Sequence, residues 1–234
     1  AVAEVLQGGR IRNAINMPSI DPKDLDSLRP YLDLCHRLGA FARQAAKGSV
    51  ESIKITYFGG IVDFDCVPLT RAVQKGWLSG VVGDEGVNDV NAPFKIKDLG
   101  IKVETVKSSE SIDYSELIEV LTTASDGDQR SVRGSLLGKG NDPRIVEVDG
   151  QAIEVRPVDT LLVVRNVDKP GIVGKLGTML GDCSVNIANM SLSRADEGES
   201  ALTIFELDDE PPVHALQAIE QDPDIQEARV SRQG

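Results

Sequence analysis

The feature that most constrains the fold lies in residues 159–234, where strand-like and helix-like patterns alternate in a fixed order. Apolar alternation predicts strands over 161–167, 184–194, 199–207 and 225–230, and helical spacing predicts helices over 172–181 and 213–220. The resulting order is βαββαβ, which is that of a ferredoxin-like fold. We therefore expect 159–234 to be a domain of its own in an α+β protein.

The preceding residues divide into two further regions. Region 1–48 holds a polar opening and a long helix with one apolar stripe, which we interpret as a linker helix. Its first residues, "AVAEVLQGGR", lack an initiator Met and a secretory pattern, and they resemble a helix entered halfway, so we expect a piece of a longer protein. Region 49–158 predicts a mixed α+β domain with two β-hairpins, the second turning at Asp149-Gly150.

Composition limits the partners. A net charge of −12 argues against nucleic acid or an anionic membrane as a partner, because both require a basic surface. The three cysteines (Cys35, Cys66 and Cys183) are scattered, which predicts buried free thiols in a reducing compartment; we expect a cytoplasmic protein, with a plastid also open. With only His36 and His214 present, we expect no metal site.

Glycines at 171, 174, 177 and 181 follow the first strand of the last region, where a nucleotide-binding loop would lie. The spacing G-x-x-G-x-x-G matches neither the dinucleotide fingerprint G-x-G-x-x-G nor the P-loop. Gly174 and Gly177 fall inside the predicted helix on one face, which favours close helix packing. We therefore expect no nucleotide cofactor in this chain.

Polar residues surround the same turn. Asn166 and Asp168 end an otherwise apolar strand, and Asn186 stands near the start of the next one. A carboxylate can receive an ammonium group, amides can bind both ends of an amino acid, and the backbone N–H groups from Gly171 to Gly174 attract an anion. These residues suit a free amino acid, although turn and capping roles are the alternative.

Several stretches carry a family resemblance. "VDKPGIVGKLGTMLGDCSVNIANM" resembles the start of an ACT domain, and specifically that of D-3-phosphoglycerate dehydrogenases. "VNDVNAPF", "LGIKV" and "VRGSLLGKGNDPRIVEVDG" are similar to the allosteric substrate-binding domain of the long form of that enzyme. "AVAEVLQGGRIRNAINMPSI" resembles the tail of its catalytic region. The resemblance covers essentially the whole chain.

The resemblance implies a regulatory role. In that family the ACT domain binds L-serine and slows the first step of serine synthesis, the NAD-dependent oxidation of 3-phosphoglycerate. The effector contacts would fall on Asn166, Asp168 and Asn186, with Gly171 at the helix start; Asn166 stands where relatives carry an aromatic or histidine side chain. The resemblance also implies homo-oligomers that pair through the edge strand 184–194, which places the ligand between two chains.

The middle region offers a second candidate site. Arg130, Arg133, Lys139 and Arg144 surround a glycine-containing turn and could hold a phosphate. The resemblance implies a phosphorylated hydroxy or keto acid as the ligand. A solvated basic face is the alternative interpretation.

Catalytic residues are not expected here. The Arg, Glu and His of hydride transfer in the family have no counterpart in this sequence, so we expect no dehydrogenase activity from these residues alone and no NAD in this chain. Two alternatives stay open: a part like the β chain of L-serine dehydratase, which shares the architecture, and a free-standing amino-acid sensor.

Overall fold

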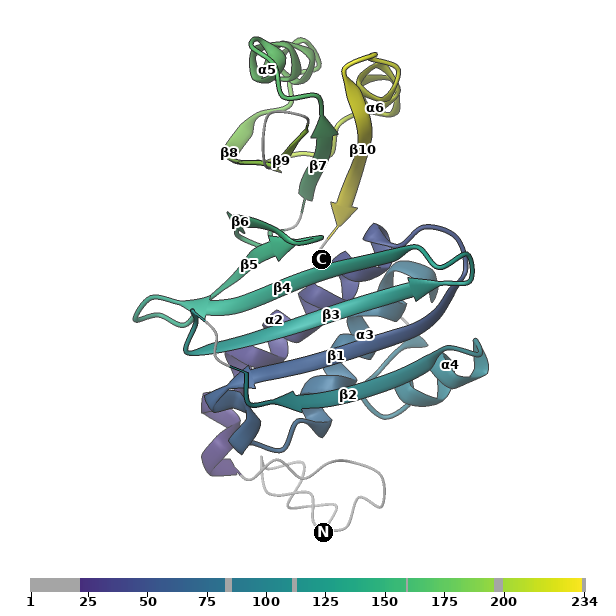
Figure 1. Ribbon diagram of the computed structural model, residues 1–234, viewed down its shortest axis with the longest axis vertical. Coiled ribbons are helices and arrows are strands. Elements are labelled where there is room, and N and C mark those ends of the chain that lie inside the picture. Colours follow the sequence, from purple (N-terminus) through teal and green to yellow (C-terminus); the bar gives the residue numbers. More distant parts are fainter. Residues whose placement is uncertain (1–21, 83–85, 111–112, 159, 196–199, 233–234) are drawn as a thin grey trace, which may run out of the picture.

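The computed structural model describes residues 22–82, 86–110, 113–158, 160–195 and 200–232. It has two β-sheets, one above the other in Figure 1. The expected entry into a helix from a preceding domain, at residues 1–21, lies outside the described residues. No helix among the described residues is long and apolar enough to cross a membrane.

The first sheet has six strands in the order β2-β1-β3-β4-β5-β6. Their bounds are β1 Val50–Gly59, β2 Lys102–Ser108, β3 Glu116–Ala124, β4 Gln129–Leu137, β5 Asp142–Val148 and β6 Gln151–Val155. The β1–β2 pair is parallel and the other pairs are antiparallel. The expected β5–β6 hairpin forms with positive φ at both Asp149 (49°) and Gly150 (80°), as a type I′ turn requires.

Helices cover one face of this sheet (Figure 1). They are α2 Pro22–Ala45, α3 Val67–Val82 and α4 Ala92–Asp98, and the 3-10 turn η1 Gly60–Asp63 precedes α3. The short helix α4 was not predicted from the sequence. The helix that we interpreted as a linker, α2, packs on the sheet: Leu34 and Leu38 lie so close to Gly134 of β4 that a side chain there would collide with them.

Glycines bring α2 and α3 unusually close together. A β-carbon on Gly39 would collide with the carbonyl oxygen of Val73, and one on Gly76 would collide with that of His36. Because both obstacles are backbone atoms, neither helix can give way by rotating a side chain. The two helices therefore cross backbone to backbone.

The second sheet confirms the ferredoxin-like expectation. Strands β7 Thr160–Asn166, β8 Ile187–Arg194, β9 Ala201–Leu207 and β10 Ile225–Arg232 pair in the order β10-β7-β9-β8, with helices α5 Ile172–Asp182 and α6 Val213–Glu220 on one face. Strand β8 starts three residues later than expected, because Ser184 turns the chain with φ 59°. β8 is the end strand of its sheet.

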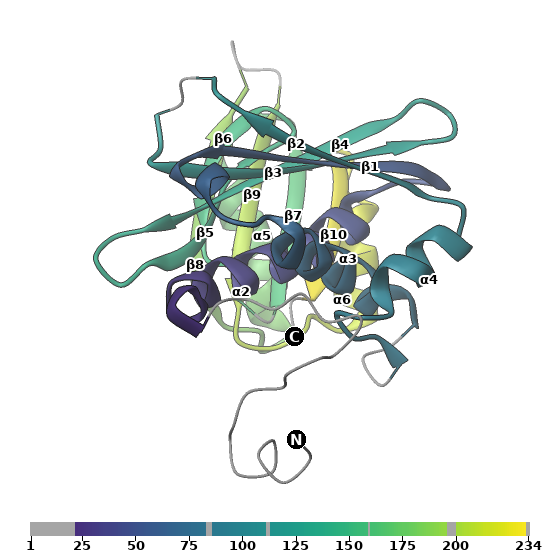
Figure 2. The ribbon, with the colours of Figure 1, turned by 90° about the horizontal axis from the view of Figure 1, so that it is seen from below.

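The two sheets share one apolar core, and their strands cross in Figure 2. Leu161 and Val163 of β7 and Ile204 of β9 belong to the same buried cluster as the apolar face of α2. The neighbouring residues Leu162 and Val164 point the other way, toward α5 and α6. Both faces of β7 are therefore buried, which explains its nearly continuous apolar run.

Charged groups join the two sheets around this core. Glu206 of β9 is buried and accepts hydrogen bonds from the backbone N and the guanidinium of Arg156, and from Asn189 Nδ2. At the other end of the junction, Asp149 accepts from Arg130 Nη1 (3.1 Å) and Arg165 Nη2 (2.6 Å). These contacts fix the position of the small sheet relative to the large one.

Candidate functional site

The loop between β7 and α5 forms a cavity of about 380 Å³. Asn166, Asp168 and Gly171 line it from the loop, and Leu192 and Arg194 line it from the end of β8. Three of the four residues predicted to bind an effector therefore lie together. The cavity lies within the range of ligand-sized pockets and suits a small molecule.

Asn166 is held rigidly at the floor of this cavity. It is 2% exposed; its Nδ2 donates to the carbonyl oxygen of Val167 (2.8 Å), and its Oδ1 accepts from Thr203 Oγ1 (3.3 Å). One of its two amide protons remains for a ligand. These two hydrogen bonds orient the Asn166 amide toward a fixed position, so the residue does more than turn the chain at the end of an apolar strand.

Asp168 and Arg194 form an ion pair across the mouth. Arg194 Nε lies 3.1 Å from Asp168 Oδ2, and the arginine side chain is 71% exposed. An exposed pair of this kind contributes at most about 1 kcal/mol, so a ligand can replace it at little cost. Arg194 was not among the residues predicted to bind an effector. The signal that could have pointed to it is a cation at the end of the predicted strand 184–194, which the ferredoxin-like topology places beside the loop.

Gly171 begins α5 in a left-handed conformation, with φ 93°. The N–H groups of the first helical turn then point toward the cavity and favour a negative group. Gly174 and Gly177 lie inside α5, so the loop between β7 and α5 does not have the glycine spacing of the dinucleotide fingerprint.

Asn186 lies at the opposite end of the sheet. Its Nδ2 donates to Asp208 Oδ2 (2.6 Å), beyond the end of β9, while Asn166 and Arg194 both flank Ala201 at the start of β9. The length of β8 separates Asn186 from the cavity, about 25 Å for eight residues. One chain therefore does not bring Asn186 to the other predicted effector residues.

The basic residues predicted to hold a phosphate do not converge. Arg130 pairs with Asp128, Asp149 and Glu227 at the junction of the sheets. Arg133 pairs with Glu119 and Glu147 within the large sheet, Arg144 lies 3.6 Å from Glu154, and Lys139 lies in the exposed β4–β5 turn. The carboxylates beside these arginines raise the pKa values of Arg130 and Arg133, against the lowering effect of burial.

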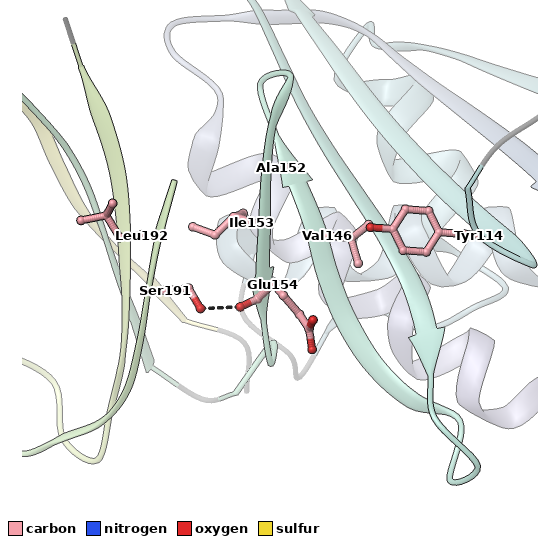
Figure 3. A pocket seen from close by; sticks show the side chains of 7 residues that line it. All are labelled: Tyr114, Val146, Ala152, Ile153, Glu154, Ser191 and Leu192. Carbon is pink, nitrogen blue, oxygen red and sulfur yellow. Dashed lines mark hydrogen bonds between the residues drawn. The ribbon is translucent and has the colours of Figure 1, made fainter. Parts of the chain in front are cut away.

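A second hollow lies beside the junction, between β6 and β8 (Figure 3). It measures about 390 Å³ and is lined by Tyr114, Ile153 and Leu192 among others. Ser191 Oγ donates to the carbonyl oxygen of Glu154 across it, which ties β8 to β6. Its lining contains none of the residues predicted to bind an effector, whereas the β7–α5 cavity contains three of them, so the β7–α5 cavity is the better candidate site.

The cysteines and histidines form no metal site among the described residues, where no three metal-binding side chains gather. All three cysteines are free thiols. Cys35 and Cys66 are buried, as expected, and burial raises the pKa of both thiols. Cys183 differs from the expectation: it is partly exposed, and its Sγ lies 3.5 Å from His214 Nε2.

The fold defines a class. A ferredoxin-like βαββαβ unit joined to an α+β domain has the architecture of a regulatory unit of the ACT type. Family models agree: residues 160–224 match the ACT domain, and residues 27–149 match the D-3-phosphoglycerate dehydrogenase intervening domain.

The chain belongs to the D-3-phosphoglycerate dehydrogenase family. It is 32% identical over 98% of its length to the D-3-phosphoglycerate dehydrogenase of Methanocaldococcus jannaschii, 36% identical over 93% to that of Synechocystis sp., and 32% identical over 88% to that of Bacillus subtilis. The matches cover 43%, 39% and 39% of those relatives, so the chain spans about two fifths of their length, in their C-terminal part.

Proposed function

We propose that this chain is the effector-binding and assembly unit of a D-3-phosphoglycerate dehydrogenase and that its effector is L-serine. The cavity that Asn166, Asp168 and the start of α5 form together carries the proposal. Its groups match the two ends of an amino acid: the helix start favours the carboxylate, and Asp168 favours the ammonium. The volume is sufficient for serine with room to spare.

The separation of Asn186 from this cavity points to a site shared by two chains. If the β8 strands of two copies pair antiparallel about Met190, residue 186 of one copy lies opposite residue 194 of the other. Asn186 of the partner subunit then reaches the cavity at Arg194. The antiparallel pairing rule thus supplies the missing amide without any change within the chain.

The exposed surface around β8 supports such pairing. β8 is an end strand, and Met190 (37%), Leu192 (40%) and Val173 of α5 (38%) are exposed apolar side chains beside it. On α5, a β-carbon on Gly174 or Gly177 would have nothing within 4 Å. Among the described residues, therefore, nothing makes the predicted close packing on this face of α5, and a second copy of α5 can approach there. Pairing also covers a strand edge that would otherwise favour aggregation.

Serine binding at this seam would stabilise one arrangement of two subunits. The junction of the sheets then passes that arrangement to the intervening domain, because Glu206 and Asp149 hold the two parts together. In a full-length enzyme we propose that this slows the NAD-dependent oxidation of 3-phosphoglycerate, the first step of L-serine biosynthesis. Couplings of this kind are typically about 1–3 kcal/mol.

Calorimetric titration of the 234-residue chain tests the proposal. L-serine is expected to bind saturably, and glycine, alanine and D-serine more weakly. Asp168→Ala and Asn186→Ala should each abolish binding. Folded protein that releases no heat with any of these amino acids would overturn effector binding at this cavity.

Mixing the two variants tests the shared site. In a hybrid of Asp168→Ala and Asn186→Ala chains, one of the two seam sites carries both changes and the other carries neither. Random re-association should therefore restore about a quarter of the sites. No recovery, while hybrids are shown to form, would contradict a site built from two chains.

A further inference from the structure

The rim of the ACT cavity holds an arginine whose hydrogen-bonding capacity is mostly unused. Arg194 Nε lies 3.1 Å from Asp168 Oδ2, and this is the only ion pair that Arg194 forms with the described residues. Its two Nη groups carry four further N–H donors. None of them has an acceptor in the part of the chain that the structure describes. These donors are therefore available to a molecule in the cavity, which Arg194 lines.

Strand register sets the distance from Arg194 to the opposite wall of the cavity. Ala201 of β9 pairs with Asn166 of β7 on one side and with Arg194 of β8 on the other. Cross-strand partners share one face of a sheet, and Val164, two residues before Asn166, shows that this is the face toward α5. Two strand spacings separate Asn166 from Arg194 by about 10 Å. The alanine between them is too short to fill that gap.

Asp168 also has an unused group. Its Oδ2 is the oxygen nearest to Arg194, whereas no donor among the described residues contacts its Oδ1. The Asp168–Arg194 pair thus presents one free anionic oxygen beside free cationic donors. An α-amino acid carries the complementary pair, because its ammonium and its carboxylate are bonded to the same carbon atom.

The start of α5 does not provide this match by itself. Its N–H groups attract any anion, whereas the planar guanidinium fork matches the two oxygens of a carboxylate. Lys169, which also lines the cavity, is held by Asp224, with Nζ 2.6 Å from Oδ1. Arg194 is therefore the group best able to fix the position of an α-carboxylate.

We propose that Arg194 binds the α-carboxylate of the effector while Asp168 Oδ1 binds its α-ammonium. The inference rests on the proposed function, because it assigns the orientation of the amino acid in the same cavity. The ligand gains contacts with both partners in exchange for an exposed ion pair that contributes little. The remaining amide proton of Asn166 donates to the side-chain hydroxyl. Three contacts around one carbon atom then distinguish L-serine from D-serine.

Three ligands that differ by one group test this orientation. Calorimetric titration of the 234-residue chain at about pH 6, where the amines are protonated, compares L-serine, L-serinamide and isoserine. L-serinamide lacks the carboxylate, and isoserine carries its ammonium one carbon further from it. L-serine should bind about tenfold more tightly than either, which corresponds to about 1.4 kcal/mol. If none of the three binds, the effector site fails and this inference with it. If L-serine and L-serinamide bind equally, only the carboxylate contact is wrong.

Variants at the rim assign the contact to Arg194. Arg194→Met keeps an unbranched side chain without the charge, so L-serine should bind about tenfold more weakly while L-serinamide changes little. Arg194→Lys keeps the charge but not the fork, and should restore part of the loss. Lys169→Met removes a cation that Asp224 already holds, and should alter neither ligand.

Thermal unfolding shows that each variant is folded. If Arg194→Met binds L-serine as tightly as the unaltered chain does, the effector site stands and the role of Arg194 is overturned. An equal loss for L-serine and L-serinamide would also overturn it, because Arg194 would then only shape the cavity.

Discussion

Asp149, although it lies in a two-residue turn, accepts several hydrogen bonds at the junction of the two sheets. It accepts from Arg130, Arg165 and the backbone N of Ser131, and its side chain is 17% exposed. Its φ of 49° also requires a residue that tolerates the left-handed region, which aspartate and asparagine do. Aspartate therefore meets two requirements at this position: a carboxylate for the two arginines and a side chain that tolerates a positive φ.

Asp149→Asn separates these two roles. Asparagine keeps the turn and the bond from Ser131, but it leaves Arg130 and Arg165 without their shared carboxylate. We expect the free energy of unfolding to fall by about 2–3 kcal/mol, in the range for charge-assisted bonds between partly buried groups. Urea unfolding followed by circular dichroism measures this change. A loss below about 0.5 kcal/mol, as for a surface substitution, would contradict the role assigned to the carboxylate.

The pKa of Glu206 determines part of how the free energy of unfolding depends on pH. Burial alone raises the pKa of its carboxyl, but hydrogen bonds from Asn189 and Arg156 outweigh this effect and lower the pKa below its ordinary value. The ionised Glu206 carboxylate therefore stabilises the folded state above the pKa of about 4.3 that it has in the unfolded chain. This contribution to the free energy of unfolding is lost as the pH falls through the lower pKa that it has in the folded chain.

Glu206→Gln tests this linkage, because glutamine fills the same space without titrating. We expect the variant to be less stable at neutral pH, and its free energy of unfolding to fall less steeply than that of the unaltered chain below about pH 4.3. Urea titrations across that range give both curves. Curves that stay parallel down to the acid limit would show that Glu206 titrates alike in the folded and unfolded states.

Glycines in helices α3 and α5 differ in how much space surrounds them. In α3, Gly76 lies against the backbone of α2, whereas Gly177 of α5 has open space around the missing β-carbon. Gly76→Ala should lower the free energy of unfolding by about 1–3 kcal/mol, since two helix backbones must separate. The melting temperature of each variant measures the effect. Equal melting temperatures for Gly76→Ala and the unaltered chain would mean that the helices cross less closely than described.

Gly177→Ala is the matched change on an open face. Alanine favours a helix over glycine by up to about 1 kcal/mol, so the subunit itself should become more stable. If a second α5 packs there, the same methyl group should weaken self-association. Sedimentation at several concentrations measures self-association, and unfolding of the monomer measures the stability of the subunit itself, so the two effects are separated. An unchanged association constant would exclude α5 from the interface.

The elements themselves were largely predictable from the sequence. The βαββαβ order, the helix 213–220 and the Asp149-Gly150 turn follow from short-range periodicity and turn chemistry, and the structure confirms them. The short helix α4 was missed because seven residues carry too little periodicity.

The site was only partly predictable, because distances across a sheet depend on strand order. Asn166 and Asp168 are close in sequence and in space, but sequence spacing could not show that Asn186 lies at the far end of β8. The pairing of Arg130 and Arg133 with carboxylates could not be foreseen either, since those partners come from distant strands.

At the scale of the whole molecule, the two sheets act as one structural body. Leu161, Val163 and Ile204 of the small sheet lie in the same core as α2, and Arg229 of β10 donates to the carbonyl oxygen of Ala45 at the end of that helix. Gln44 forms two further bonds with the backbone of β10. The ACT domain and the intervening domain are therefore joined by both apolar packing and hydrogen bonds.

Such a core predicts that the chain, studied as a monomer, unfolds in a single cooperative transition. Calorimetry should show one peak whose measured enthalpy agrees with the van't Hoff enthalpy. Residues 159–234 expressed alone should be less stable and prone to associate, because their inner face would expose Leu161, Val163 and Ile204 and leave Glu206 without Arg156. Substituting serine at Val163 in the whole chain should shift the single peak downward without splitting it. Two resolved peaks, with the ACT domain melting separately at the temperature of the isolated piece, would show instead that the two sheets unfold independently and that the shared core does not join them into one cooperative unit.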